Sequence, residues 1–105
     1  MDYFSAEREL GNRDTRKVGN NTYLERDRWS PGTIFLRLHR TRIVAFHEDG
    51  SVRLNSGGWQ TVTTKERLNW VSGIRVFQQD WQWYVYIPKT GETVPYSDGM
   101  VLFTD

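Results

Sequence analysis

Apolar and polar residues alternate through four segments in the first half of the chain. A two-residue period runs through residues 17–26, 33–39, 42–47 and 51–55, which is typical of strands with one buried face. Asp49-Gly50 separates two of these segments and predicts a hairpin, because a tight two-residue turn needs residues that tolerate positive φ. Gly19-Asn20-Asn21 predicts a bulge or bend inside the first strand.

The hairpin turns predict which side chains share a face of the sheet. With Arg40-Thr41 and Asp49-Gly50 as two-residue loops, Phe35 is paired with Phe46 and both turns give the same partition. The expected core face holds Ile34, Leu36, Leu38, Ile43, Ala45, His47, Val52 and Leu54. The expected opposite face holds Phe35, Arg37, His39, Arg42, Val44, Phe46, Arg53 and Asn55.

The second half of the chain predicts a short helix and a second hairpin. Thr63 and Glu66 have the spacing of a capping box, which predicts a helix near residues 64–71. Residues 74–78 and 81–87 predict strands joined across Gln79-Asp80, and residues 99–103 predict a short last strand. The polar residues 1–16 predict an arm or a short helix.

These elements predict a mainly β fold, specifically a β-rich α+β domain. We expect a strongly curved antiparallel sheet or small barrel of about six to seven strands with one short helix. At 105 residues the chain is long enough for one core and too short for two, so residues 1–105 are interpreted as a single domain.

Composition excludes several kinds of chemistry and leaves a weak charge bias. The chain has no Cys, which excludes disulfides, thiolate metal sites and Cys nucleophiles and favours a reducing, cytoplasmic compartment. Its two His residues are predicted on opposite faces, so we expect no metal site, and no motif indicates a cofactor. Residues 1–45 carry nine Lys and Arg against six Asp and Glu, and residues 46–105 carry five against seven, so the basic bias lies in the first half. No apolar run is long enough to span a membrane.

The predicted arginine-bearing face is the main candidate for binding. Exposed aromatic rings interleaved with Arg are typical of sheets that stack single-stranded bases and hold phosphates. If another element covers this face, Phe35 and Phe46 become a core layer, and the basic hairpin tip remains the exposed contact. The candidate binding residues are Phe35, Arg37, His39, Arg40, Arg42, Phe46 and Arg53.

The polar segment 55–69 is an alternative site. Its dense polar side chains would suit a small hydrolase or nuclease, with candidates Asn55, Thr61, Thr63, Lys65, Arg67 and Asn69. The structural interpretation gives these residues ordinary roles: Gly57 and Gly58 relieve a turn beside Trp59, and Thr63 begins a helix.

Several motifs together resemble a group of small bacteriophage proteins. They are Gly19-Asn-Asn-Thr-Tyr-Leu24, Leu38-His-x-Thr41, Asp49-Gly50 and Ser56-Gly-Gly-Trp-x-Thr-Val-Thr-Thr-Lys-x-Arg-Leu-Asn69. The resemblance implies a phage origin and a location in the host cytoplasm, and it transfers no site residue. Arg40 departs from the pattern and adds to the basic tip.

By analogy with other small phage proteins, we expect a non-enzymatic accessory protein that acts by binding. Its expected partner is a host protein, as for an inhibitor or anti-defence factor, or nucleic acid. Three alternatives stay open: the hydrolase or nuclease, a structural or virion-associated subunit, and assembly into a homo-oligomer.

Overall fold

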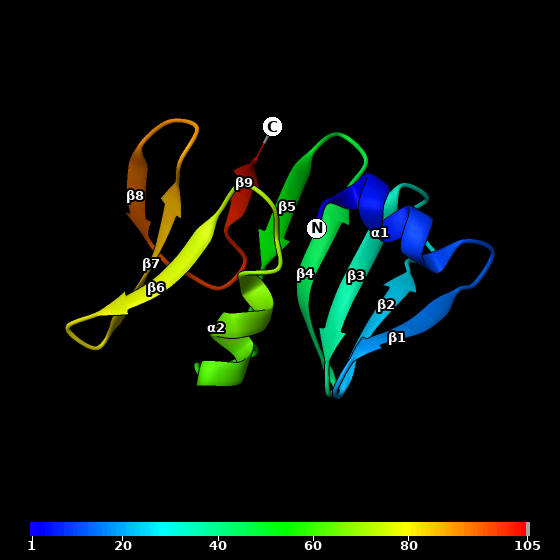
Figure 1. Cartoon of the computed structure of the whole chain (residues 1–105), viewed down its shortest axis with the longest axis horizontal. Coiled ribbons are helices and arrows are strands. Elements are labelled where there is room, and N and C mark those ends of the chain that lie inside the picture. The colour runs from blue at the N-terminus through cyan, green and yellow to red at the C-terminus, as the bar shows by residue number, and fades with distance from the viewer. Residues whose placement is uncertain (105) are drawn as a thin grey trace.

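The computed structural model describes residues 1–104, which form two helices and nine strands (Figure 1). The helices are α1 (Tyr3–Leu10) and α2 (Val62–Leu68). The strands are β1 (Thr15–Gly19), β2 (Thr22–Arg26), β3 (Thr33–Leu38), β4 (Thr41–His47), β5 (Ser51–Leu54), β6 (Arg75–Gln79), β7 (Gln82–Ile87), β8 (Glu92–Pro95) and β9 (Val101–Phe103).

The strands form two antiparallel sheets. The larger sheet has six strands in the order β1-β2-β3-β4-β5-β9, and the smaller has three in the order β6-β7-β8. The mainly β, α+β class is therefore confirmed. The predicted barrel or strongly curved sheet is wrong: among residues 1–104, the large sheet stays open, with β1 and β9 at its two edges.

The hairpin turns differ from the predicted ones by one residue each. His39 and Arg40 form the first loop, since Leu38 pairs with Thr41, and His39 takes a φ of 54°. The second loop has three residues, Glu48 to Gly50, with Gly50 at a φ of 91°, which matches a turn closed by a left-handed glycine.

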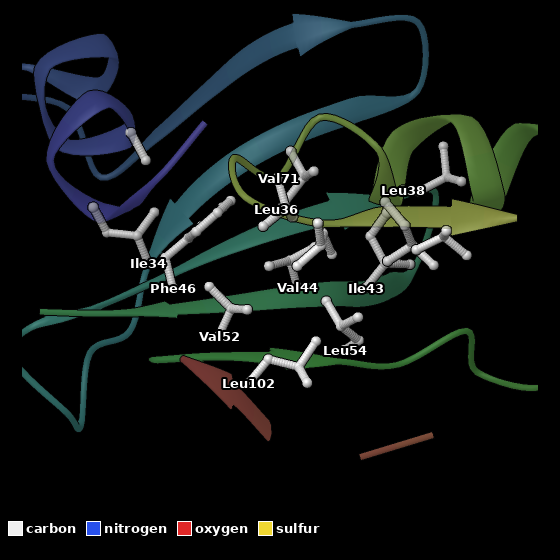
Figure 2. Close-up of a cluster of buried hydrophobic side chains, with 14 of the residues drawn as sticks. Ile34, Leu36, Leu38, Ile43, Val44, Phe46, Val52, Leu54, Val71 and Leu102 are labelled. Atoms are coloured by element: carbon white, nitrogen blue, oxygen red, sulfur yellow. The ribbon is translucent and has the colours of Figure 1, made fainter. Parts of the chain in front are cut away.

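A bulge in β4 accompanies these turns and changes the faces of the sheet. Leu36 pairs with Val44, but Arg37 pairs with Arg42, so Ile43 is an extra residue in β4. Ile43, Val44 and Phe46 are all buried in the core (Figure 2). The predicted faces were right for β3 and β5 and wrong for β4 beyond Ile43, because the bulge shifts Val44 and Phe46 inward and Ala45 and His47 outward.

One hydrophobic core joins both sheets and both helices. Leu24, Leu36, Phe46 and Leu54 supply it from the large sheet, and all four are fully buried. The same core also contains Tyr3, Ala6 and Leu10 of α1, Leu68 of α2, and Val76, Trp83 and Val85 of the small sheet. Both helices therefore contact strands of the large sheet, α2 also contacts β6, and the small sheet lies beside the large one (Figure 1).

Local caps explain where the helices begin. The Asp2 carboxylate accepts a hydrogen bond from the Ser5 amide at 2.8 Å, and the Asp2 amide donates to the Ser5 hydroxyl at 2.9 Å, which is a capping box. Thr61 caps α2 by accepting from the Thr64 amide at 3.1 Å. The predicted Thr63 cap is wrong, and the helix begins two residues earlier than its position implied.

Two further strand predictions needed correction. The segment 17–26 is not one bulged strand but parts of β1 and β2, which turn at Asn20 and Asn21, the latter with a φ of 53°. In the second hairpin the turn falls on Asp80 and Trp81, both at positive φ. Trp81 is accordingly 93% exposed.

Truncating Phe46 and truncating Phe35 should have very different effects on stability. Phe46 is fully buried, whereas Phe35 on the other face is half-buried. We expect Phe46→Ala to lower the free energy of unfolding by about 3–5 kcal/mol and Phe35→Ala by only about 1 kcal/mol. Urea unfolding followed by circular dichroism measures both. Equal losses would contradict the bulged register.

Candidate functional site

The face of the large sheet opposite the core forms the candidate site, which we call the open face. Paired residues of neighbouring strands lie on the same face of a sheet. The strand pairings therefore show that the open face extends from Tyr23 and Arg37 to Arg53 and Val101. Its residues are Lys17, Tyr23, Glu25, Phe35, Arg37, Arg42, Ala45, His47, Arg53, Val101 and Phe103. Arg42, Arg53, Val101 and Phe103 are exposed.

One carboxylate organises two of the arginines on the open face. Glu25 accepts from Arg42 Nε at 3.0 Å through Oε1, and its Oε2 lies 3.2 Å from Arg37 Nε. Arg37 also donates to the backbone carbonyl of His39. Charge-assisted bonds of this kind fix the guanidinium planes.

Each of these arginines lies over an aromatic ring. The Arg42 guanidinium carbon is 4.2 Å from the centre of the Phe35 ring, and that of Arg37 is 4.5 Å from the centre of the Tyr23 ring. Both distances are within the range of cation–π contacts. The open face therefore presents two planar, cationic groups positioned over aromatic rings.

A hollow lies in the centre of the open face. It has a volume of about 360 Å³ and is lined by Asp27, Ser30, Thr33, Phe35, Arg42, Ala45, His47, Arg53 and Asn55. The depression exists because the side chain of Ala45 is small. Arg42, Arg53 and His47 line it with groups that bind anions. The Thr33 hydroxyl lies 3.0 Å from His47 Nδ1. Among residues 1–104, Arg53 has no acidic partner within ion-pair distance.

The structure brings four of the seven predicted binding residues together. Phe35, Arg37, Arg42 and Arg53 lie on the open face as predicted, and His39 and Arg40 form the neighbouring hairpin turn. The predicted placement of Phe46 is wrong, because the β4 bulge turns its ring into the core.

The residues of the alternative polar segment do not converge on one site. Asn55 lines the open-face hollow, whereas Thr61 and Thr63 line a pocket at the tip of the β3–β4 hairpin.

The remaining residues of the segment make structural contacts or lie in α2. Arg67 Nε donates to the Thr22 hydroxyl at 2.9 Å and the guanidinium lies over Trp70. The Asn69 side chain binds both backbone polar groups of Val76, at 2.7 and 2.9 Å. Lys65 is half-buried in α2. Within residues 1–104, no cluster of three or more His, Asp or Glu is placed to hold a metal ion.

A buried hydroxyl and one carboxylate fix the loop that begins at Ser56. Asp98 Oδ1 accepts from the Ser56 amide and hydroxyl, both at 2.8 Å, and from the Tyr96 hydroxyl at 2.7 Å. Burial alone would raise the pKa of Asp98, but the hydrogen bonds from Ser56 and Tyr96 outweigh it and lower that pKa. Burial, followed by the adjoining Asp98, raises the pKa of Tyr96.

Sequence reasoning missed Tyr23, Glu25 and the Ala45 hollow. Interpreting Asn20-Asn21 as a hairpin turn would have paired Tyr23 with Lys17 and Glu25 with Thr15, because Asn is common at positive φ. The pairing of Tyr23 with Arg37 and of Glu25 with Phe35 depends on the β2–β3 loop instead. Nothing in the local pattern indicated the β4 bulge, so Ala45 was expected in the core.

Fold and site together define a small, mainly β domain whose large sheet has one covered face and one arginine-lined face. Over residues 5–103 the chain matches the family described as Kyanoviridae Gp96 protein, and it belongs to that family. The phage origin implied by the sequence motifs is thereby confirmed. No curated protein and no solved structure matches the chain. None of the helices described is long and apolar enough to cross a bilayer.

Replacing Asp98 should weaken the fold in a pH-dependent way. A lowered pKa means that the Asp98 carboxylate stabilises the folded state above its ordinary pKa of 3.8, and that this contribution is lost as the pH falls further. We expect Asp98→Asn to lower the Tm at pH 7 by about 4–8 °C, with the difference from wild type shrinking below about pH 4. Thermal unfolding between pH 2.5 and 7 measures this. Asp14→Asn is the control, because Asp14 is exposed and has no side-chain hydrogen bond or ion pair within residues 1–104.

Two adjacent glycines should differ in their tolerance of a methyl group. Both have positive φ, 63° at Gly57 and 83° at Gly58, but a Cβ at Gly57 would lie 2.7 Å from Thr41 Cγ2, whereas one at Gly58 meets nothing within 4 Å. We expect Gly58→Ala to cost about 1 kcal/mol of backbone strain and Gly57→Ala roughly 1–3 kcal/mol more from overpacking. Denaturant unfolding compares them. Indistinguishable variants would show that the loop does not depend on its contact with Thr41.

Proposed function

We propose that this protein is a non-enzymatic phage accessory protein that binds single-stranded nucleic acid on its open face. The observation that carries the proposal is the hollow lined by Ala45 and Phe35, where Arg42, Arg53 and His47 outnumber the one carboxylate of the lining, that of Asp27. Sheet faces that combine aromatic rings with Arg are suited to phosphates and unstacked bases.

The open face offers two kinds of contact to a strand. Arg53 and Arg42 donate several N–H groups toward the hollow, which suits a phosphate. The guanidinium groups over Tyr23 and Phe35 are planar groups of the kind on which a base can stack. These contacts are independent of base identity, so the proposal predicts weak sequence preference.

Single-stranded nucleic acids fit this face better than duplexes. The candidate groups lie on a sheet surface and in a hollow, and neither helix belongs to the open face, since α1 and α2 pack on the core side. Readout of a duplex needs an element that enters a groove. Stacking needs bases that are already free of a duplex.

The expected affinity is moderate because the charge is local. The chain has a formal net charge of only +1, and Glu25 already neutralises part of the charge of Arg37 and Arg42. If Arg37, Arg42 and Arg53 each neutralise one phosphate, log Kd should change with log salt concentration with a slope of about 2 in magnitude.

Fluorescence anisotropy with labelled oligonucleotides tests the proposal. We expect a 12-nucleotide single strand to bind more tightly than the matching duplex, with the salt dependence given above. Arg42→Gln combined with Arg53→Gln should weaken binding by about tenfold per arginine.

Arg75→Gln is the matched control, because Arg75 is exposed on β6 of the small sheet. A single strand that does not bind at low salt, or a control as damaging as the double variant, would contradict the proposal. Salt-sensitive binding to an acidic host protein, without binding to oligonucleotides, would instead indicate that the partner of the open face is a host protein, the other partner class expected from the sequence.

A further inference from the structure

A second concave site lies at the tip of the β3–β4 hairpin, and we call it the tip pocket. Its volume is about 550 Å³, and its lining residues are Leu38, His39, Arg40, Thr41, Ile43, Ser56, Trp59, Thr61, Thr63 and Thr64. This volume falls within the range of pockets that bind small molecules, roughly 300–1,000 Å³. The pocket uses none of the residues of the open face.

The floor of the tip pocket is apolar. Leu38 and Ile43 are 5% and 1% exposed, and Ile43 is the extra residue of the β4 bulge. Trp59 adds an indole that is 68% exposed. An exposed Trp beside a buried aliphatic floor provides a surface for a flat, apolar ring.

The position of Trp59 is fixed by the backbone that carries it. The Trp59 amide donates to the Ser56 carbonyl at 3.0 Å, and the Thr61 amide donates to the Trp59 carbonyl at 2.9 Å. Gly57 packs against Thr41 at the other wall of the pocket. The backbone that carries the indole is therefore fixed at the rim before any ligand arrives.

The walls of the tip pocket carry hydroxyl groups, and two of them have no partner. Thr61 and Thr64 hydroxyls lie 3.0 Å apart, and the Ser56 hydroxyl donates to Asp98. The hydroxyls of Thr41 and Thr63 make no hydrogen bond within residues 1–104. They are available to a polar group at the edge of a ring.

The charge of the lining selects the sign of the ligand. His39 and Arg40 form the hairpin turn at the pocket, and none of the ten lining residues is acidic. Arg40 has no ion-pair partner within the described chain. A cationic ligand would find no counter-charge here, whereas an anionic group would meet a guanidinium.

We propose that the tip pocket binds a nucleoside monophosphate, with its base stacked on Trp59 above Leu38 and Ile43 and its phosphate bound by Arg40. Thr41 and Thr63 then serve the polar edge of the base or the sugar hydroxyls. The same chemistry is offered by a free nucleotide and by the phosphorylated end of a strand. The proposal does not depend on nucleic-acid binding by the open face.

Titration of ¹⁵N-labelled protein with AMP, followed by NMR, tests the tip pocket directly. We expect the indole N–H signal of Trp59 and the amides of residues 61–64 to shift together. Adenosine alone should bind at least fivefold more weakly, and inorganic phosphate alone should not shift the indole. A 5′-phosphorylated oligonucleotide that shifts the same signals more tightly than AMP would identify a strand end as the natural source.

Variants separate this site from the open face. Arg40→Gln and Trp59→Leu should each weaken AMP binding at the tip pocket at least fivefold, whereas Arg42→Gln and Arg53→Gln should leave the AMP-induced shifts of Trp59 and residues 61–64 unchanged. Trp81→Leu is the matched control, since Trp81 is also an exposed hairpin Trp. Thr63→Val removes a free hydroxyl from an exposed position of α2 and should also weaken binding.

Three results would overturn the proposal. They are the absence of shifts at millimolar AMP, shifts confined to the open face, and equal affinity for adenosine and AMP. Because the open-face variants are tested in the same titration, loss of the tip pocket and loss of the open face give different patterns.

Discussion

The extra residue in β4 is the constraint on which the rest of this structure depends. A strand alternates its side chains between two faces, so one inserted residue exchanges the faces of everything beyond it. Because Ile43 is inserted, Phe46 lies in the core and Ala45 lies on the open face. A regular β4 would bury Ala45 and His47 and expose Phe46, and the open face would carry a bulky ring where it now has a hollow.

The same bulge connects the two candidate sites. On one side of the sheet it places the buried Ala45 between Arg42 and Arg53, and on the other side the inserted residue itself, Ile43, lines the tip pocket. The β3–β4 hairpin thus contributes to both sites, with its turn residues at one and its strand residues at the other. Ser56 and Asp98 hold the opposite wall of the tip pocket in place, from segments more than 40 residues apart in the chain.

The parts that could be predicted from the sequence were those set by local chemistry. Alternation located β3, β4 and β5, and it assigned Phe35, Arg37, Arg42 and Arg53 to one face, because the side-chain period holds as long as a strand is regular. Turn residues were harder. Gly50 was recognised as a turn residue, but the sequence does not distinguish a two-residue loop from a three-residue loop closed by a left-handed glycine.

Features that depend on tertiary contacts could not be predicted in this way. The bulge at Ile43, the division into two sheets and the close approach of Gly57 to Thr41 are set by packing between distant segments. The helix cap shows the same limit. Thr63 and Glu66 had the correct spacing, but Thr61 has the backbone conformation and the bond to Thr64 that the cap needs.

Glu25 gives the open face a property that neither arginine has alone. One carboxylate holds two guanidiniums, at 3.0 and 3.2 Å, so an anion that draws Arg42 away leaves the full negative charge of Glu25 with Arg37. The two arginines are therefore coupled through a shared counter-ion, and under the proposed function an isolated anion would meet stronger competition from Glu25 than a pair of anions at matching separation. Glu25 would then favour ligands that carry several negative charges close together, because these compete for both guanidiniums at once.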